Sequence, residues 1–311
     1  MTRIAVLKGG HSLERQVSLK SGARVEAALR RLGHEVIEVD GGAGLVEALQ
    51  AAAPELAFVA LHGRDGEDGT VQELLEALGI PYTGSRVAAC ILASDKVLAK
   101  HALRGAGIPT PEFYAFSEAA FRGLGVAQAL PAISSRLAFP IVVKPARQGS
   151  ALGIKFARAQ GDLPAALIAA FSYDSKVLLE RYVRGRELAV SVLVEGGLPR
   201  ALPIVEAVPE ADSFYDFESR YEIGRTRFIC PAVLDAELAA RTQALALEAF
   251  EVLGCSVFAR VDLMLDGDGE PHVLEVNPIP GLTETSLLPQ AADAAGIGFD
   301  ELIARIVAGA A

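Results

Sequence analysis

The first 80 residues alternate short apolar runs with helical patterns, and this alternation constrains the fold more than any other feature of the chain. Between the runs, apolar residues recur at helical spacing, and glycines close the helical segments. Such an alternation predicts a parallel sheet covered by helices on both faces. The expected strands are residues 3–8, 34–40 and 56–62, and the expected helices are residues 20–33, 44–52 and 71–79.

In open parallel sheets, ligands bind beyond the carboxyl ends of the strands. The candidate places here are the glycine-bearing loops after Lys8 and after Leu61, the second of which reads GRDGEDG. Glycines in loops of this size also serve as plain turns, and short loop motifs match often by chance. These residues alone leave both interpretations open.

Length and composition bound the class of protein. A chain of 311 residues suggests two or three domains, and its net charge of −10 argues against a general nucleic-acid-binding surface. No apolar run approaches the roughly 18 residues of a membrane helix, and the N-terminus lacks a signal-peptide pattern. Cys90, Cys230 and Cys255 show no CxxC spacing, which favours free thiols in a reducing compartment. We therefore expect a soluble cytoplasmic protein that binds neither nucleic acid nor membrane.

The rest of the chain divides into two further segments. In the middle segment, helices accompany short strands, which suggests an α+β domain with a small antiparallel sheet whose first helix has Ser94 as its N-cap. The last segment contains a long helix and a polar stretch with aromatic residues, and long loops of this kind are often functional lids. The expected domains are residues 1–93, 94–183 and 184–311, with a lid loop over residues 209–229.

Near the C-terminus, the sequence DGDGE joins two strand patterns. A two-residue loop at positions 268–269 would place Asp262 opposite Glu275 and Arg260 opposite Asn277, all on one face. A three-residue loop would split them. Facing carboxylates repel unless a cation lies between them, and two carboxylates with an amide oxygen suit Mg²⁺ or Mn²⁺. A buried salt-bridge network with Arg260 explains the same residues equally well.

Two lysines are candidate phosphate ligands. Lys144 lies in the apolar strand IVVK, where a buried ammonium is costly unless it meets an anion, and the turn RQGSALG that follows could close backbone amides over phosphates. Lys96 lies in the first turn of a helix, which disfavours a cation unless an anion is near. The run VLLERYV could form an apolar wall for a nucleobase, with Glu180 and Glu187 near its polar edge. Solvated surface lysines and ordinary core packing are the alternatives.

Together these features resemble the ATP-grasp superfamily and, within it, the D-alanine–D-alanine ligase family. The resemblance covers essentially the whole chain and implies a mixed α/β and α+β class: a three-domain ATP-grasp fold with an N-terminal Rossmann-like parallel-sheet domain. It rests on six blocks that follow one another in the family's order: VLKGGHSLERQVSLKSG, LHGRDGEDGTVQELLEALGIPYTGS, SDKVLAK, VVKPARQGSALG, FYDFESRY and PGLTETSLLP.

The resemblance also implies an activity: ATP-dependent joining of two D-alanines through an acyl phosphate, for peptidoglycan precursors. It implies ATP and two Mg²⁺ or Mn²⁺ ions as cofactors and a homodimer as the assembly. The residues that match the family's nucleotide contacts are Lys96, Lys144, Gly149, Ser150, Glu180, Tyr182, Val183, Glu187 and Arg220. Those that match its metal ligands are Asp262, Glu275 and Asn277.

By the same resemblance, Glu14 holds the ammonium of the first D-alanine, with Ser150 and Tyr221 as its hydrogen-bonded partners and His62 nearby. Arg260 and Gly281 match the oxyanion contacts. Ser286 and Leu287 match the site for the second carboxylate, which agrees with a helix beginning at Ser286. The catalytic set implied in this way is Glu14, Ser150, Tyr221 and Arg260.

The sequence departs from the family pattern at four positions, Gln148, Ala151, Arg220 and Pro278. These changes leave the metal ligands intact but bear on the positioning of phosphate and of the second substrate. One alternative function is a related ligase whose second substrate is D-lactate, D-serine or another amino acid. The lid with Tyr221 looks more like the dipeptide-forming version. Another alternative is a nucleotide-binding regulator without turnover, against which the intact acidic and arginine positions argue.

Overall fold

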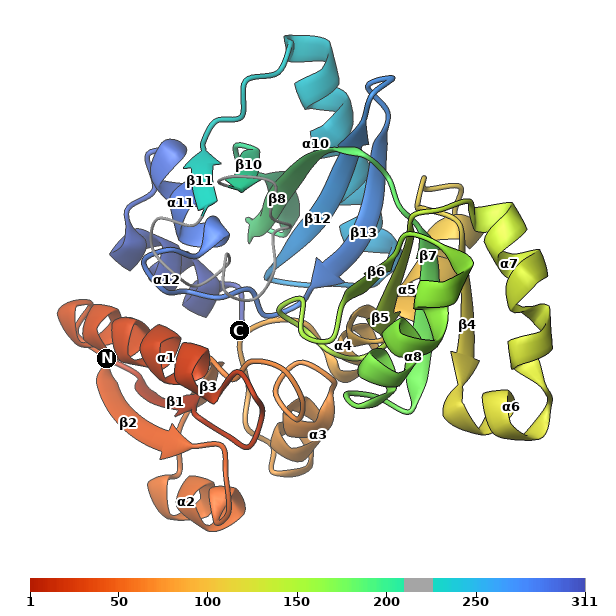
Figure 1. Ribbon diagram of the computed structural model, residues 1–311. Helices are drawn as coiled ribbons and strands as arrows, with labels where there is room; N and C mark the ends of the chain where they lie inside the picture. The colour runs from red at the N-terminus through yellow and green to blue at the C-terminus, as the bar shows by residue number, and fades with distance from the viewer. Residues whose placement is uncertain (210–225, 311) are drawn as a thin grey trace.

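The structure, a computed structural model, describes residues 1–209 and 226–310. Its strands form three sheets, which lie in three bodies around a common centre (Figure 1). The N-terminal sheet carries the red and orange elements, the central sheet lies among the green and yellow ones, and the C-terminal sheet includes the long blue strands. The expected mixed α/β class with an N-terminal parallel sheet is confirmed.

The N-terminal sheet is parallel, as the alternation predicts, and its order is β2-β1-β3. Because the strands run in one direction, the loops after β1 and after β3 lie at the same edge of the sheet. The sequence pattern does not predict α4, and it places the start of α1 too late. The elements are β1 (Arg3–Lys8), α1 (Arg15–Arg31), β2 (Glu35–Asp40), α2 (Leu45–Ala52), β3 (Leu56–Val59), α3 (Thr70–Ala77) and α4 (Val87–Ser94).

The central sheet is antiparallel, with the order β4-β7-β5-β6, as expected for an α+β unit. The expected N-cap of α5 is wrong by one residue: Asp95, and not Ser94, accepts the amides of Val97 and Leu98. Ser94 ends α4 and donates to a carbonyl there. The elements are α5 (Lys96–Gly105), β4 (Phe113–Ser117), α6 (Glu118–Gly123), α7 (Leu130–Leu137), β5 (Ile141–Pro145), β6 (Lys155–Ala157), α8 (Leu163–Phe171) and β7 (Lys176–Arg181), with short 3₁₀ turns at Val126–Ala129 and Gln160–Asp162.

The C-terminal sheet has the order β11-β10-β8-β12-β13, and β9 pairs with β8 off this path. β9 and β10 are separate strands, because residues 202–204 lie between them. The last four residues of the expected lid form β11, and residues 210–225 lie outside the described part of the chain. The elements are β8 (Gly185–Glu195), β9 (Leu198–Ala201), β10 (Val205–Pro209), β11 (Thr226–Ile229), α10 (Ala236–Val252), β12 (Phe258–Asp266), β13 (Pro271–Asn277), α11 (Leu287–Ala294) and α12 (Phe299–Ala308).

The apolar cores connect the three bodies unequally. One core joins the N-terminal sheet and α1 to β8, α11 and α12, with Phe58, Phe258 and Ile306 fully buried in it. The central sheet has a separate core with α7 and α8, around Leu137 and Ile141. α5 lies between them, since its apolar face packs into the core of β8, β12, β13 and α10. None of the helices among the described residues combines the length and apolarity needed to cross a bilayer.

The β12–β13 hairpin confirms the expected pairs but not the expected loop. Asp266 and Glu270 close a three-residue loop, since the Asp266 amide donates to the Glu270 carbonyl over 3.1 Å. A β-bulge opposite Asp262 and Leu263 then shifts the register by one residue. The bulge restores Asp262 opposite Glu275 and Arg260 opposite Asn277. The four side chains therefore share a face for a reason that the two-residue loop does not supply.

Candidate functional site

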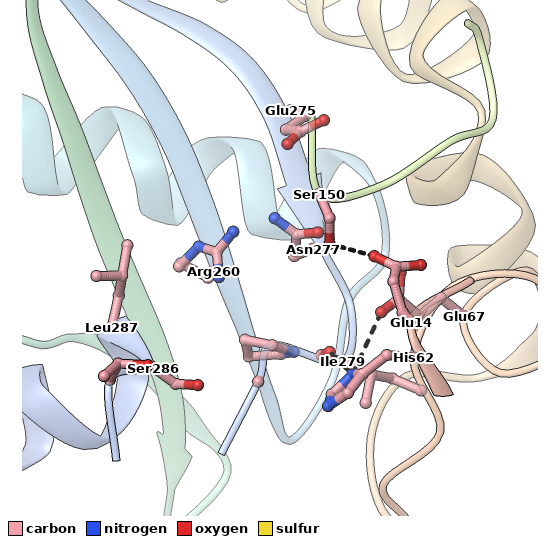
Figure 2. A pocket seen from close by; sticks show the side chains of 13 residues that line it. Glu14, His62, Glu67, Ser150, Arg260, Glu275, Asn277, Ile279, Ser286 and Leu287 are labelled. Atoms are coloured by element: carbon pink, nitrogen blue, oxygen red, sulfur yellow. Dashed lines mark hydrogen bonds and ion pairs between the residues drawn. The ribbon is translucent and has the colours of Figure 1, made fainter. Parts of the chain in front are cut away.

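The buried acid of the site is Glu14, which lies in the loop after β1 at the start of α1. Its Oε1 accepts a hydrogen bond from the Ser150 hydroxyl, which comes from the turn after β5 (Figure 2). A Cβ at Gly63 would clash with the other carboxylate oxygen, Oε2, so this glycine makes room for the acid. Within residues 1–209 and 226–310, no side chain or backbone donor is bonded to Oε2, which leaves one acceptor in the cavity.

The environment of Glu14 changes its acidity. Burial, with a smaller contribution from the neighbouring carboxylate of Glu67, raises the pKa of Glu14 to about 7. The Ser150 hydrogen bond and the nearby Lys96 partly offset that rise. A bound ammonium would restore the ionised form, because an opposite charge at hydrogen-bond distance favours the carboxylate. The arrangement thus suits an amino-acid ligand with a free amine.

His62 lies beside Glu14, near the start of the loop between β3 and α3. Both of its ring nitrogens contact protein atoms. Nδ1 lies 3.2 Å from the carbonyl oxygen of Ile279 and 3.5 Å from Oε1 of Glu67. Nε2 lies 3.0 Å from the hydroxyl of Ser21 on α1. The side chain is buried at 5% exposure and borders the cavity with its ring (Figure 2). His62 is therefore fixed between the N-terminal loops and the segment that follows β13.

The oxygen-donor face on β12 and β13 is neutralised by basic side chains. Arg260 holds both carboxylate oxygens of Asp262 over 2.6 and 2.7 Å, and the amide of Asn277 donates to the same carboxylate over 3.2 Å. Glu275 forms an ion pair with Lys96 over 2.8 Å. The salt-bridge alternative thus describes Asp262 and Arg260, while Glu275 pairs with a different cation, Lys96.

The donor set fits a hard divalent ion. Asp262, Glu275 and Asn277 supply two carboxylates and one amide from adjacent strands, the ligand types that Mg²⁺ and Mn²⁺ prefer. In the part of the chain that the structure describes, no cluster of three or more His, Cys, Asp or Glu side chains could hold a metal, so the amide is needed as the third ligand. Arg260 and Lys96 would have to share or release the carboxylates when an ion binds.

Among the residues expected to contact a nucleotide, Glu180 and Lys144 belong to a chain of buried ion pairs. Glu180 on β7 contacts Lys144 on β5 over 2.6 Å and Lys100 on α5 over 2.5 Å. Burial lowers the pKa of Lys100 to about 8, against the favourable charge of Glu180. The two cations hold the pKa of the Glu180 carboxyl below its ordinary value in spite of its burial. Glu180 is therefore kept as an ionised acceptor.

The expected adenosine contacts lie where the central and C-terminal sheets meet. Tyr182 and Val183 form the link between β7 and β8, and the ring of Tyr182 meets Phe156 edge-on at a centroid distance of 5.7 Å. Glu187 lies on β8 opposite Met264 of β12. A link of three residues between two sheets is suited to hold a flat base between strands from both.

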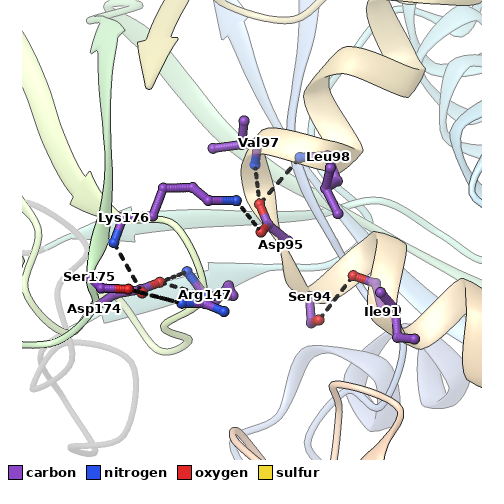
Figure 3. A network of polar contacts seen from close by, with 9 residues as sticks. All are labelled: Ile91, Ser94, Asp95, Val97, Leu98, Arg147, Asp174, Ser175 and Lys176. Carbon is purple, nitrogen blue, oxygen red and sulfur yellow. Dashed lines mark hydrogen bonds and ion pairs between the residues drawn. The ribbon is translucent and has the colours of Figure 1, made fainter. Parts of the chain in front are cut away.

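The turn after β5 has an unusual backbone. Ser150 and Ala151 both have positive φ, at 53° and 58°, a conformation that costs free energy for residues with a side chain. Before the turn, the amide and side chain of Arg147 bind the buried Asp174, and Asp95 pairs with Lys176 over 2.7 Å (Figure 3). This network ties the turn to the N-terminus of α5, so that Ser150 reaches Glu14.

The structure gives a physical explanation for two of the four departures from the family pattern. The backbone carbonyl of Gln148 accepts Lys96 over 2.9 Å, a contact that any side chain at this position would keep. Pro278 is buried and follows the last residue of β13, where its missing amide ends the strand ladder. Nothing in the structure explains Ala151. Arg220 lies outside the described residues.

The far end of the cavity is the start of α11. Ser286 is the N-cap residue, and its hydroxyl accepts the amide of Thr283 over 3.0 Å. A Cβ at Gly281 would come within 2.7 Å of the same hydroxyl, so the loop closes tightly there. Leu287 begins the helix. The amides of this first turn carry the positive end of the helix dipole, which suits a carboxylate.

One cavity brings most of the expected substrate and metal residues together (Figure 2). The residues that line it and were expected are Glu14, His62, Ser150, Arg260, Glu275, Asn277, Gly281, Ser286 and Leu287. A neighbouring cavity of about 330 Å³ contains Lys96 and Gly149 and shares Glu275 and Asn277 with the first. Asp262, which is paired with Arg260, does not line the first cavity, and neither do Lys144, Glu180, Tyr182, Val183 and Glu187. Tyr221 lies outside the described residues.

Several residues of the site have no individual signal in the sequence. Glu67 and Thr285 line the cavity, although only their loops stand out as acidic or polar runs. Lys100 could have been found from its place four residues after Lys96, on the same face of one helix. Phe156 gives no such signal, because one aromatic residue in a short strand is ordinary.

The similarity to solved structures defines the class of protein. A D-alanine–D-alanine ligase from Bacillus anthracis, crystallised with ATP, is 36% identical with a TM-score of 0.82, covering 100% of this chain and 97% of that one. The VanG D-Ala:D-Ser ligase from Enterococcus faecalis is 28% identical with a TM-score of 0.84, covering 100% and 99%. The three sheets are thus arranged as in an ATP-grasp ligase.

Sequence relatives narrow the class to one family. Residues 102–308 match the family model described as the D-ala D-ala ligase C-terminus, and residues 40–85 match that of the N-terminus. A relative named D-alanine–D-alanine ligase from Syntrophotalea carbinolica is 48% identical over 99% of this chain and 96% of its own length. The chain belongs to the D-alanine–D-alanine ligase family.

Proposed function

We propose that this chain joins two D-alanine molecules into D-alanyl-D-alanine while ATP is converted to ADP and phosphate, in support of peptidoglycan precursor synthesis. The observation that carries the proposal is the single cavity between the sheets. It has the buried Glu14 at one end, the start of α11 at the other, and Arg260 between them. Membership of the ligase family supports the same activity.

The first step activates a poor electrophile. A carboxylate oxygen of the first D-alanine attacks the γ-phosphorus of ATP, the bond from that phosphorus to the β-phosphate oxygen breaks, and ADP leaves an acyl phosphate. We assign the ammonium of this D-alanine to Glu14 and Ser150. Lys96, Lys144 and the backbone at Gly149 would neutralise and orient the phosphates.

The second step forms the peptide bond. The amine of the second D-alanine attacks the acyl carbon, the bond from that carbon to the phosphate oxygen breaks, and the departing phosphate takes up the proton that the amine gives up. Arg260 and the amide of Gly281 would stabilise the tetrahedral oxyanion, and Ser286 with the Leu287 amide would hold the second carboxylate. His62 would border the first substrate without exchanging a proton with it.

The remaining assignments complete the site. Asp262, Glu275 and Asn277 would hold two Mg²⁺ or Mn²⁺ ions, which neutralise the phosphate charge during transfer. Glu180, Tyr182, Val183 and Glu187 would contact the adenosine. Arg220 and Tyr221 would belong to a lid, within residues 209–229, that keeps the acyl phosphate from water. We also propose domains over residues 1–93, 94–183 and 184–311, a cytoplasmic location and a homodimer.

A product assay tests the proposal directly. With ATP, Mg²⁺ and D-alanine, we expect D-alanyl-D-alanine and phosphate in equal amounts, and no product from L-alanine. Omission of the metal ion should abolish both. Phosphate release that does not depend on D-alanine, or the absence of dipeptide at saturating substrates, would contradict the activity.

A different second substrate is the alternative that the likeness to a D-Ala:D-Ser ligase raises. Competition of D-alanine with D-serine and with D-lactate at the second position distinguishes the possibilities. D-lactate has a hydroxyl in place of the amine, so raising the pH should favour D-alanine alone, because only an amine gains nucleophilicity by losing a proton. We expect dipeptide from D-alanine to predominate at every pH.

A further inference from the structure

The segment that joins β13 to the start of α11 is held by side chains from the N-terminal domain. The amide of Leu282 donates to the hydroxyl of Ser21 over 3.1 Å, and the carbonyl of Leu282 accepts from Nη1 of Arg24 over 2.7 Å. Ser21 and Arg24 lie one turn apart on α1. One helix therefore satisfies both backbone groups of one residue in a different domain.

His62 makes a third contact, with the hydroxyl of the same Ser21. The Ser21 oxygen accepts the Leu282 amide, so its own proton is available for Nε2 of His62, 3.0 Å away. Nε2 then acts as an acceptor, and the ring carries its proton on Nδ1, which faces the Ile279 carbonyl at 3.2 Å. The order of donors and acceptors is thus consistent from the Leu282 amide to the Ile279 carbonyl.

Arg24 is held in its position by further packing and is partly buried. Its guanidinium covers the ring of Phe299 on α12 with 4.0 Å between Cζ and the ring centroid. Burial lowers its pKa, and Glu284 is the charge that works in the opposite direction. Leu282 is 1% exposed and lies in the core that the N- and C-terminal elements share. A change at Leu282 would therefore disturb packing as well as backbone.

Leu282 lies next to the residues expected to contact the second substrate. Gly281 precedes it, and Thr283 follows it with its amide and hydroxyl on the Ser286 hydroxyl, over 3.0 and 2.8 Å. A rotation of the Leu282 peptide would turn the Gly281–Leu282 link and move the start of α11. The position of the oxyanion amide and of the carboxylate site thus depends on two side chains of α1.

We propose that Ser21 and Arg24 are positioning residues for the second substrate, acting through the backbone of Leu282, and that His62, with both ring nitrogens engaged, supports them. The proposal rests on the proposed ligase function, because it assigns a consequence to that site. It predicts a specific kinetic pattern: the second D-alanine binds less well, while the first D-alanine and ATP are unaffected.

The test compares Ser21→Ala and Arg24→Met with wild-type protein in the dipeptide assay. We expect the KM for the second D-alanine to rise about tenfold in each variant, as for loss of one buried hydrogen bond, with the KM values for ATP and for the first D-alanine within about twofold. Arg24→Lys should recover most of the loss, because one donor at the Leu282 carbonyl is enough.

Matched controls come from the same helix. Arg31→Met removes an arginine that also reaches from α1 to α12, where it pairs with Asp300. Ser18→Ala removes a buried serine whose hydroxyl donates to the Ala60 carbonyl. Among the described residues, no hydrogen bond or ion pair joins Ser18 or Arg31 to residues 279–286, so neither variant should raise the second KM selectively. A fall of all kinetic constants together with thermal stability would mean a purely structural role and would overturn the proposal.

Hydrogen exchange gives a readout that does not depend on turnover. In Ser21→Ala, the amide of Leu282 loses its acceptor, so peptides that cover residues 279–286 should exchange at least several-fold faster, while peptides from β12 stay unchanged. If wild-type protein makes no dipeptide, the proposed function fails, and the kinetic part of this proposal fails with it. If wild-type protein is active and both variants keep the second KM and the exchange rate, only the positioning role is refuted.

Discussion

The N-terminal sheet meets the C-terminal elements through a shared apolar core, whereas the central sheet meets α5 through a small apolar cluster and two ion pairs. Phe58, Phe258 and Ile306 belong to the first junction. The second has a small apolar cluster and the pairs Lys100–Glu180 and Asp95–Lys176, over 2.5 and 2.7 Å. The apolar groups of the first junction have no ionic partners, whereas each charged group of the second junction can exchange one ionic partner for another.

This contrast matches the two halves of the site. The substrate half, with Glu14 and His62, is set by loops of the domain pair that shares a core. In the half that the proposal assigns to nucleotide and metal, Lys96 pairs with Glu275 and Arg260 pairs with Asp262. Under the proposed function, the first half would be prearranged for a small amino acid, and the second would exchange internal cations for metal ions and phosphates. This difference leads to the following expectations.

The largest effect is expected on the charged half. Asp262→Asn removes one carboxylate from the metal face but keeps an oxygen for Arg260, so folding should survive while turnover falls about 10³-fold, with the loss of several kcal/mol of charge stabilisation. Steady-state rates at saturating ATP, D-alanine and Mg²⁺ measure the effect. Asp266→Asn, at the tip of the same hairpin and paired with His272, is the control and should keep near-normal rates. Unchanged turnover in Asp262→Asn would refute the metal face.

Lys100 tests how far the ion pairs also hold the fold. Lys100→Met leaves the buried Glu180 with Lys144 alone, which should lower the free energy of unfolding by about 3 kcal/mol. Denaturant unfolding measures it. The double variant with Glu180→Gln should recover part of the loss, because the uncompensated charge is then gone. Equal destabilisation by the single and double variants would show that packing and not charge is lost.

Glu14 should affect substrate binding and protein stability in opposite directions. Glu14→Gln should raise the KM for the first D-alanine about 10- to 100-fold, since a charge-assisted contact to the ammonium is lost. In wild-type protein the same KM should rise as pH falls through 7, because the pKa of Glu14 in the free protein is about 7. Kinetics between pH 6 and 8.5 measure both. A pH-independent KM in wild-type protein would contradict this role.

The stability of the same variant should change in the opposite direction. The folded pKa of Glu14 lies above the unfolded value near 4.5, so its contribution to stability is greatest below pH 4.5 and is lost as pH rises through 7. The free energy of unfolding of Glu14→Gln at pH 8 should therefore exceed that of wild-type protein by about 1–3 kcal/mol, as measured by denaturant unfolding, and this gain should vanish below pH 4.5. Lower stability of the variant at pH 8 would show that the acid is not strained by burial.

The smallest effect is expected from a surface charge at the apolar junction. Arg31 and Asp300 join α1 to α12 over 2.6 Å, but their side chains are 57% and 39% exposed. Arg31→Met should change the free energy of unfolding by less than about 0.5 kcal/mol, because water and salt screen such pairs. Thermal unfolding at low and high salt checks it. A loss comparable with that of Lys100→Met would remove the contrast between the two junctions.

Local patterns predicted the sheets because each strand and helix has its own periodicity. The run RIAVLK and the helix before Gly254 follow from such patterns alone. The cap at Asp95 was mistaken for Ser94, because both residues are good caps and the choice depends on where α4 ends. The roles of Ser21 and Arg24 could not be predicted, since their partner Leu282 lies about 260 residues further on and offers only backbone atoms.

The family resemblance supplied most of the site residues, but geometry could not be read from it. It did not reveal that Lys96 binds Glu275 or that Lys100 shares Glu180 with Lys144. Ion pairs of this kind depend on which of several nearby charges is nearest after folding. The domain boundaries and the roles of Tyr221 and Arg220 remain predictions.

The bulge in β13 determines which face of the strand the odd- and even-numbered side chains occupy. Pro271 and Val273 point into the core at odd positions, and after the bulge Val276 does so at an even one, which leaves Glu275 and Asn277 on the opposite face. If the strand kept all its residues but lost the bulge, Glu275 and Asn277 would turn toward the core, whereas deletion of Leu274 would remove the bulge with its extra residue and leave both side chains on the outer face. The extra residue and the bulge that accommodates it therefore have to occur together.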